Sequence, residues 1–338
     1  MPCEFVFLRS KRTLVNQLRH IIQPIESDLN RFNRLFDETL THPNKLLNVI
    51  FEHIRQHRGK QMRPILLLLV AREFGVPTDA TYLSAVMLEL LHNASLIHDD
   101  IVDESDERRG QAAVHSEYGN NVAVLVGDFL LSSSLEKAAQ TGNLRIVEHI
   151  SHLGKQLASG EIIQLSNTYE DEFSEDSYYD VIKLKTAALF SSAAEVGALS
   201  VAASEEQVAL MSRFGSLLGM CFQIKDDIFD YFDNPQIGKP TGNDMSEGKL
   251  TLPVLYVLRT KANDRIKNLA RRVRAGLATK EEIAELVQFT IDNGGVDYAQ
   301  EVMQKYADAA VAILDRFKNE EIKQSLLSYI KFVSERTI

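Results

Sequence analysis

Two short stretches of the chain carry the same pattern, Asp99-Asp100-Ile101-Val102-Asp103 and Asp226-Asp227-Ile228-Phe229-Asp230. Aspartate occurs 21 times in the 338 residues. At that frequency, chance would place one Asp-Asp-x-x-Asp in such a chain about 0.08 times, and two with a probability of about 0.003. Composition therefore does not explain the pair, and the two clusters need a common chemical reason.

Helical geometry suggests what that reason is. If each cluster lies on a helix, Asp99 and Asp103 are one turn apart with carboxylates within ~6 Å, and Asp226 and Asp230 repeat that spacing. Like charges this close repel, and both clusters are embedded in apolar sequence. Carboxylate oxygens at this spacing suit Mg²⁺, which also takes phosphate oxygens of a substrate. An EF-hand loop is absent around the clusters, and a di-iron bundle would need two Glu-x-x-His motifs, of which the chain has one, Glu89-Leu90-Leu91-His92. The pattern predicts metal binding, with N-capping or a solvated acidic surface as the alternatives.

The chain also has basic residues at positions that suit the binding of an anionic substrate. Taken singly, each is weak evidence, because most Lys and Arg side chains are solvated. Together with the aspartates they predict a site in which Mg²⁺ holds one side of a diphosphate and cations hold the other. The chain has neither the Gly-rich phosphate-binding fingerprints nor Gly-x-Ser-x-Gly. The basic residues concerned are Lys60, Arg63, Arg108, Arg109, Lys185, Lys225, Lys239 and Lys249.

The rest of the chain predicts an all-α fold. Glycine and proline together make only about 7% of the residues, and apolar residues recur at three- and four-residue spacing. We expect one large helical bundle formed by residues 1–338, with residues 263–338 as helical scaffold. One loop, residues 233–248, is rich in glycine and proline. The main expected helices are residues 81–101, 121–139, 144–166, 178–202, 205–232 and 252–258.

Composition narrows the possible functions. The net charge of −10, from 37 basic and 47 acidic residues, makes general nucleic-acid binding an unfavourable interpretation. The longest apolar run, residues 65–71, is far shorter than the ~20 residues of a membrane span, and we expect no stable membrane anchor. Two cysteines, Cys3 and Cys221, fit a reducing compartment. The expected location is the cytoplasm.

At this point the chain resembles a known family, the trans-isoprenyl diphosphate synthases or polyprenyl synthetases, from Lys60 through Pro253. The agreement is closest to long-chain members of the octaprenyl type. Three motifs in this order carry the resemblance: Leu96-Ile97-His98-Asp99-Asp100-Ile101-Val102-Asp103-Glu104-Ser105-Asp106-Glu107-Arg108-Arg109-Gly110, then Phe222-Gln223-Ile224-Lys225-Asp226-Asp227-Ile228-Phe229-Asp230, then Gly238-Lys239-Pro240-Thr241-Gly242-Asn243-Asp244-Met245-Ser246-Glu247-Gly248-Lys249-Leu250-Thr251-Leu252-Pro253.

The sequence also departs from the family pattern. The usual Gly-Gly-Lys-Arg-x-Arg-Pro reads Arg58-Gly59-Lys60-Gln61-Met62-Arg63-Pro64, which changes the first glycine and the middle arginine. Lys225 stands where an apolar or small polar residue is commoner, and Phe229 replaces a common leucine. Lys60 and Arg63 are kept, so the resemblance still implies activity, with Lys225 as a residue that adjusts metal or diphosphate affinity.

The resemblance implies a helical isoprenoid synthase fold with a central cavity, a homodimer, and a role for each matching residue. Its substrates would be isopentenyl diphosphate and an allylic diphosphate, joined with the help of three Mg²⁺ ions. Asp99, Asp103 and Asp226, supported by Asp100, Asp227 and Asp230, would hold the metal ions. Arg108, Lys185 and Lys239 would contact the allylic diphosphate, together with Lys249 beside the loop. Lys60, Arg63, His92 and Arg109 would bind isopentenyl diphosphate, and Thr186 and Gln223 would face the carbocation.

Product length is predicted from the helix before the first cluster. Ala94 and Ser95 lie about one turn before Asp99, with Leu91 a further turn back. Short-chain members of the family tend to carry bulky aromatic residues at the first two positions. The small side chains predict an open tunnel and a long polyprenyl product, unless they are small only for helix packing. A second layer around Phe129 and Leu130 is a candidate floor for the tunnel.

Other functions remain as alternatives. A short-chain farnesyl or geranylgeranyl diphosphate synthase would use the same clusters. A class I terpene cyclase normally has a mixed Asn/Asp, Ser/Thr and Glu second motif and no second anion site. A non-catalytic partner subunit of a heteromeric synthase usually loses one or both clusters. A phosphohydrolase would need a water-activating dyad, which the sequence does not show.

Overall fold

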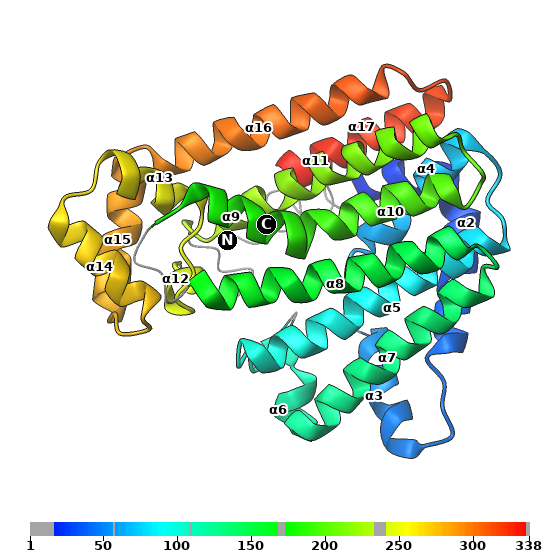
Figure 1. Cartoon of the computed structure of the whole chain (residues 1–338), viewed down its shortest axis with the longest axis horizontal. Coiled ribbons are helices and arrows are strands. Elements are labelled where there is room, and N and C mark those ends of the chain that lie inside the picture. Colours follow the sequence, from blue (N-terminus) through cyan, green and yellow to red (C-terminus); the bar gives the residue numbers. More distant parts are fainter. Residues whose placement is uncertain (1–16, 57, 109, 168–172, 233–240, 336–338) are drawn as a thin grey trace, which may run out of the picture. The chain divides into compact units, whose positions relative to one another are not determined.

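The computed structural model describes residues 17–56, 58–108, 110–167, 173–232 and 241–335. Nearly every element in this part of the chain is a helix (Figure 1), so the predicted all-α class is confirmed. The elements are η1 (Gln23–Ile25), α2 (Glu26–Thr39), α3 (Lys45–Gln56), α4 (Met62–Phe74), α5 (Asp79–Val102), β1 (Glu107–Arg108), β2 (Gln111–Ala112), α6 (Val114–Tyr118), α7 (Asn120–Gln140), α8 (Leu144–Asn167), α9 (Glu175–Ile182), η2 (Lys183–Ala187), α10 (Ala188–Leu199), α11 (Glu205–Phe229), α12 (Asn243–Ser246), α13 (Leu252–Thr260), α14 (Asp264–Arg274), α15 (Lys280–Asp292), α16 (Gly295–Leu314) and α17 (Glu320–Glu335).

The chain divides into two compact units. Unit 1 consists of Met1–Lys155, Leu189–Gly215 and Ile313–Tyr329. Unit 2 consists of Gln156–Ala188, Ser216–Ala312 and Ile330–Ile338. The first aspartate cluster therefore belongs to unit 1 and the second to unit 2.

In unit 1, α4 and α5 form the core. The apolar run of α4 is buried from Ile65 through Ala71, as expected for a helix that is hydrophobic on all sides. Helix α5 packs against α4 and lies side by side with α7 (Figure 1). It begins with a capping box, in which the Thr78 side chain accepts the backbone N–H of Thr81 and the Thr81 side chain accepts the backbone N–H of Thr78. This cap ends the preceding loop and sets where the long helix that carries Asp99 begins.

One expected helix is interrupted. We predicted a continuous helix over residues 178–202, but a π-helical turn, η2, separates α9 from α10. Glycines on two other helices make room for it. A Cβ on Gly160 of α8 would lie 2.8 Å from Cγ of Lys185, and one on Gly219 of α11 would lie 2.4 Å from Cα of Ala187. Such turns are rare and often mark functional positions.

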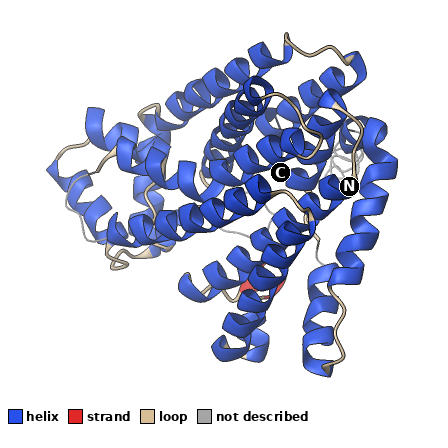
Figure 2. Ribbon diagram, turned by 45° about the vertical axis from the view of Figure 1, so that its right-hand side comes forward, coloured by secondary structure: helices blue, strands red, loops and turns tan. Residues whose placement is uncertain are grey.

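A short hairpin in unit 1 was also missed by the sequence analysis. The two-residue strands β1 and β2 pair antiparallel, with Glu107 opposite Ala112 and Arg108 opposite Gln111. Figure 2 shows this pair as the only strands in the described part of the chain. The hairpin follows α5 directly and fixes the backbone of Arg108 close to the first aspartate cluster.

No helix in the described part of the chain has both the length and the apolar composition needed to cross a membrane.

Candidate metal and diphosphate site

The first aspartate cluster ends helix α5. Asp99 and Asp103 are half-exposed, whereas Asp100 between them is buried, with 3% of its surface exposed. Asp103 is the C-cap residue, and its backbone N–H donates to the carbonyl oxygen of Asp99 over 2.8 Å. The predicted helical spacing is confirmed for Asp99 and Asp103. The two outer carboxylates are therefore the ones within reach of a ligand from solvent.

The buried Asp100 is paired with Arg108. The arginine Nε donates to Asp100 Oδ1 over 2.8 Å, and its Nη2 contacts the same oxygen. Burial raises the pKa of Asp100, and the Arg108 guanidinium opposes that rise. In this structure Arg108, expected to contact the allylic diphosphate, is thus held beside the first cluster by one of its aspartates.

Two residues expected to bind isopentenyl diphosphate meet in unit 1. Arg63 in the first turn of α4 lies 2.9 Å from His92 on α5, measured from Nη1 to Nε2. The Arg63 guanidinium also lies over the ring of Phe190, 5.0 Å from its centroid. Lys60 is exposed just before α4. Arg63 and His92 are therefore brought together as the resemblance implied.

The two departures in the motif before α4 have a structural explanation. Arg58 Nη1 donates to Oδ1 of Asn33 over 3.2 Å, and Gln61 Nε2 donates to the same oxygen over 2.8 Å. Arg58 also pairs with Asp37. Both departing residues thus bind helix α2. They anchor the turn in which Gln61 adopts a left-handed backbone with φ of 51°.

The residues expected to set product length lie on α5 before the first cluster. Leu91 and Ala94 are buried, and Ser95 is half-buried, with its hydroxyl donating to the carbonyl oxygen of His92 over 2.9 Å. Phe129, proposed for a second layer, packs against Phe51 on α3 at 5.4 Å between ring centroids. The Phe129 ring therefore takes part in the α3–α7 contact.

The second cluster repeats the burial pattern of the first. Asp226 on α11 and Asp230, directly after the last residue of that helix, are half-exposed, and Asp227 has 3% of its surface exposed. Both oxygens of Asp227 accept hydrogen bonds, Oδ2 from the Tyr178 hydroxyl at 2.5 Å and Oδ1 from Nε2 of Gln223 at 2.8 Å. Burial raises the pKa of Asp227 to about 7, although these two hydrogen bonds act in the opposite direction. The middle aspartate is thus an internal partner in both clusters.

The last aspartate of the second cluster binds the start of α12. The carboxylate of Asp230 accepts the backbone N–H groups of Asn243 at 2.9 Å and Asp244 at 3.2 Å, at the start of α12. Lys249 after this helix pairs with Glu247 over 2.9 Å. Asp230 therefore joins the end of the second cluster to the start of α12.

The two departures on α11 are partners. The Lys225 ammonium lies over the Phe229 ring, 4.8 Å from its centroid, which is the contact expected at i, i+4 spacing on a helix. A cation and an aromatic ring have therefore replaced the commoner residues together.

Lys185 and Thr186 lie on the π-helical turn. The Lys185 ammonium pairs with Glu161 and donates to Oε1 of Gln164 over 3.1 Å, both on α8. The Thr186 hydroxyl donates to Oε1 of Gln223 over 2.7 Å. Lys185, predicted to contact the allylic diphosphate, is thus bound to α8, and Thr186 and Gln223, predicted to face the carbocation, are bound to each other. The sequence analysis missed Glu161, Gln164 and Tyr178, because these contacts span 21 to 49 residues and leave no local pattern.

The π-helical turn allows a matched pair of variants on α8. A Cβ on Gly154 would meet no atom within 4 Å, so Gly154→Ala is expected to raise the free energy of unfolding by about 0.5–1 kcal/mol through helix propensity. Gly160→Ala should instead lower it by about 1–3 kcal/mol, because the new methyl overlaps Lys185 and Leu184, and should also reduce activity. Urea unfolding of both variants measures the difference, and equal stabilisation would contradict the role given to Gly160.

The outer aspartates of the two clusters are the candidate ligands for Mg²⁺. In the part of the chain that the structure describes, no three His, Cys, Asp or Glu side chains gather closely enough to hold an ion by themselves. Mg²⁺ usually binds through one or two carboxylates, several waters and substrate phosphates, rather than in an all-protein cage. The half-exposed pairs Asp99 and Asp103, and Asp226 and Asp230, fit that mode of binding.

Two expected site residues, Arg109 and Lys239, lie outside the described residues.

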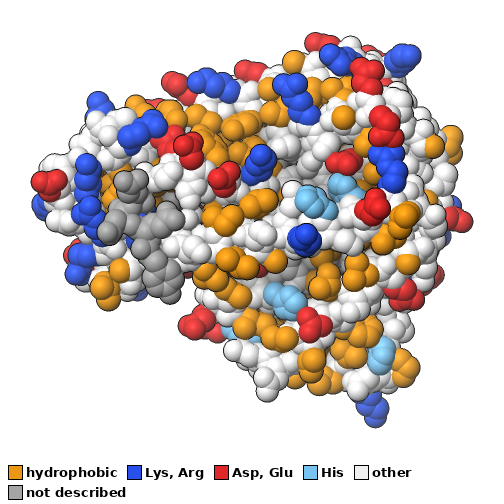
Figure 3. Space-filling view, in the orientation of Figure 1, with side chains coloured by type: hydrophobic (Ala, Val, Ile, Leu, Met, Phe, Trp, Pro, Cys, Tyr) orange, Lys and Arg blue, Asp and Glu red, His pale blue; other side chains and the backbone are white. Residues whose placement is uncertain are grey.

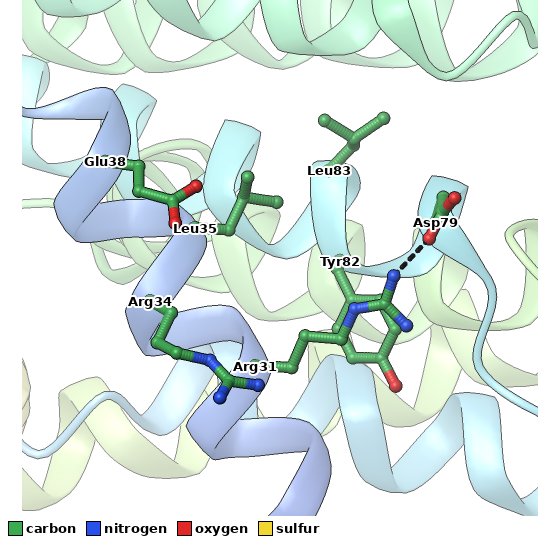
Figure 4. Close-up of a pocket in the computed structure, with 7 residues that line it drawn as sticks. All are labelled: Arg31, Arg34, Leu35, Glu38, Asp79, Tyr82 and Leu83. Atoms are coloured by element: carbon green, nitrogen blue, oxygen red, sulfur yellow. Dashed lines mark hydrogen bonds and ion pairs between the residues drawn. The ribbon is translucent and has the colours of Figure 1, made fainter.

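A pocket elsewhere in unit 1 is unrelated to the clusters. It has a volume of about 460 Å³ and lies between α2 and the start of α5 (Figure 4). Asp79 in this pocket and Asp99 are separated by about 30 Å along α5. The residues that line it are Arg31, Arg34, Leu35, Glu38, Asp79, Tyr82 and Leu83.

The sequence and the fold of the chain are similar to those of known proteins. The sequence model of the polyprenyl synthetase family matches residues 44–290. Octaprenyl diphosphate synthase of Haemophilus influenzae is 34% identical over 93% of this chain and 94% of its own length. The crystal structure of geranylgeranyl pyrophosphate synthase from Bacteroides thetaiotaomicron is 46% identical, with a TM-score of 0.84 over 95% of this chain and 100% of that one. That of polyprenyl synthase from Caulobacter crescentus, complexed with calcium and isoprenyl diphosphate, is 30% identical, with a TM-score of 0.88 over 95% of this chain and 98% of that one. The chain, with its two Asp-Asp-x-x-Asp clusters, belongs to the polyprenyl synthetase family.

Proposed function

We propose that this protein condenses isopentenyl diphosphate with an allylic diphosphate, farnesyl or geranylgeranyl, in consecutive steps that give a long trans-polyprenyl diphosphate. The observation that carries the proposal is the shared form of the two clusters. In each, the outer aspartates are half-exposed, the middle one is buried, and a cation expected to contact diphosphate lies in the same unit. A relative of the same family has been crystallised with calcium and isoprenyl diphosphate.

Different residues would bind the metal ions and the allylic diphosphate. Asp99, Asp103 and Asp226 would hold three Mg²⁺ ions, which when bound would neutralise charge on the departing diphosphate. Arg108 and Lys185 would exchange their present carboxylate partners for diphosphate oxygens of the allylic substrate.

The second substrate would be positioned by a separate set of cations. Arg63 and His92 already lie together, and with Lys60 and Arg109 they would bind the diphosphate of isopentenyl diphosphate. Its double bond would attack the allylic cation, and the released diphosphate would take the proton. No side chain of the protein is then needed as a general base.

A long product is supported by the small Ala94 and Ser95 on α5. The 46% identity to a geranylgeranyl pyrophosphate synthase favours a second candidate function, a shorter product of that class. Both functions use the same clusters and differ only in where the growing chain is stopped. Product length therefore discriminates between them.

The proposal extends to assembly and location. Helices α3 and α7 of unit 1 expose Leu46, Val49 and Leu125, with 46%, 54% and 68% of their surfaces accessible. Hydrophobic side chains are visible on the surface over these helices (Figure 3). An apolar surface of this kind supports a homodimer. We further propose that both units serve one catalytic domain and that the enzyme works in a reducing compartment, the cytoplasm.

The test is a direct assay. Purified protein is incubated with Mg²⁺, labelled isopentenyl diphosphate and farnesyl diphosphate, and the extracted alcohols are sized. Elongated polyprenols that require the allylic substrate and disappear with EDTA are the expected result. Free phosphate without elongated lipid would favour a hydrolase, and an inert, folded sample would favour a partner subunit.

A further inference from the structure

A chain of hydrogen bonds, one buried and two partly buried, links three elements of unit 2. The Tyr178 hydroxyl on α9 donates to Oδ2 of Asp227 on α11 over 2.5 Å. The Gln223 amide nitrogen, one turn earlier on α11, donates to Oδ1 of the same carboxylate over 2.8 Å. The Thr186 hydroxyl on η2 then donates to the Gln223 amide oxygen over 2.7 Å. Tyr178 begins this chain, and neither the family motifs nor the sequence analysis gave it a role.

When the Asp227 carboxylate is ionised, the chemistry of the groups fixes the direction of every bond. An ionised carboxylate can only accept, so the amide nitrogen of Gln223 must face Asp227 and its carbonyl oxygen must face away, toward Thr186. The alternative orientation of the amide would place two acceptors against each other. Asp227 therefore decides which end of the Gln223 amide is presented beside Thr186.

Tyr178 in turn holds Asp227. Its side chain is nearly buried, with 8% of the residue exposed, and its ring packs edge-on against Tyr179 at 5.4 Å between centroids. Without the hydroxyl, Oδ2 of Asp227 would lose a short hydrogen bond inside a buried site, where replacing it with water is difficult. The carboxylate could then rotate and release Gln223.

We propose that Tyr178 is a positioning residue, which through Asp227 holds the Gln223 amide with its carbonyl oxygen toward Thr186. The role rests on the proposed function, because Thr186 and Gln223 are the residues expected to face the allylic cation. An oriented carbonyl dipole stabilises such a cation, whereas a flipped or mobile amide does not. Tyr178 thus acts on the rate of the reaction without touching substrate.

The first test compares Tyr178→Phe with Tyr179→Phe, which removes a hydroxyl from the neighbouring residue. Tyr178→Phe is expected to lower kcat about 10- to 100-fold, as a small misplacement of a catalytic group does, and to leave KM for isopentenyl diphosphate and the Mg²⁺ half-saturation within about twofold. Tyr179→Phe should retain the wild-type kcat. If both variants match an active wild type, this inference falls and the proposed function stands. An inactive wild type would instead overturn the proposed function.

The Mg²⁺ dependence separates positioning from metal binding. If Asp227 were a metal ligand held in place by Tyr178, Tyr178→Phe would raise the Mg²⁺ half-saturation about 10- to 100-fold. That result would overturn the inference.

Should Tyr178→Phe fail to fold, Asp227→Asn and Asp227→Ala replace it. Asparagine can still accept from Gln223 and donate to the Tyr178 oxygen, so Asp227→Asn should keep a higher kcat than Asp227→Ala at an unchanged Mg²⁺ half-saturation. Equal kcat in the two Asp227 variants would contradict the role of Tyr178.

Discussion

Asp99→Asn and Asp226→Asn are each expected to lower kcat about a thousandfold, which corresponds to roughly 4 kcal/mol of lost transition-state stabilisation. Each change removes one negative charge from a half-exposed carboxylate at an outer position of its cluster. The side chain keeps its shape, so the fold should be preserved. Steady-state assays over a range of Mg²⁺ concentrations measure the effect, and the half-saturation concentration should rise with the loss of kcat.

Asp79→Asn is the matched control for the Asp99 variant. It makes the same chemical change at the start of helix α5, about 30 Å from Asp99 along the helix, and loses a surface ion pair with Arg31. Activity close to that of the wild type is expected, because surface pairs contribute little. If Asp99→Asn or Asp226→Asn kept activity within tenfold of the control with an unchanged Mg²⁺ requirement, the metal role of that aspartate would be wrong.

Ala94→Phe is expected to shorten the product to the farnesyl or geranylgeranyl class. Ala94 is buried on α5, about 7.5 Å along the helix axis before Asp99. A phenyl ring at this position would fill the space into which we propose that the growing chain extends. Sizing the polyprenols by chromatography gives the answer directly, and the total rate of the first condensation should change much less than the length.

Ala94→Ser serves as the control for size, since it keeps a small side chain at the same position. Its products should match those of the wild type. Circular dichroism and thermal unfolding check that Ala94→Phe has folded. An unchanged product length in a folded Ala94→Phe variant would contradict the proposal that residues on α5 limit the length of the polyprenyl product.

Local signals in the sequence predicted several helices well. The expected helix over residues 81–101 is α5, Asp79–Val102, because Thr78 gives a capping signal and the apolar spacing continues to the aspartates. Residues 121–139 and 144–166 correspond to α7 and α8 within one residue at each end. The placement of the first cluster follows from α5 and that of the second from α11, Glu205–Phe229, which ends one residue before Asp230 and therefore earlier than the expected helix over 205–232.

Other features depend on contacts between distant segments. The π-helical turn at Lys185 requires Gly160 and Gly219 from two other helices, so no pattern within residues 178–202 could reveal it. The burial of Asp100 and Asp227 could not be read from the clusters either, because it depends on which face of α5 or α11 is covered. Tyr178 binds Asp227 across 49 residues. For these positions the tertiary packing, rather than local propensity, decides the structure.

A crystal grown with Mn²⁺ in place of Mg²⁺, together with an allylic diphosphate analogue that cannot ionise, gives the most direct measurement. The account predicts anomalous peaks about 2.1 Å from carboxylate oxygens of Asp99, Asp103 and Asp226, with each ion also bound to a diphosphate oxygen of the analogue. Metal peaks distant from the outer aspartates, or ions at a cluster that bind no diphosphate oxygen, would contradict it.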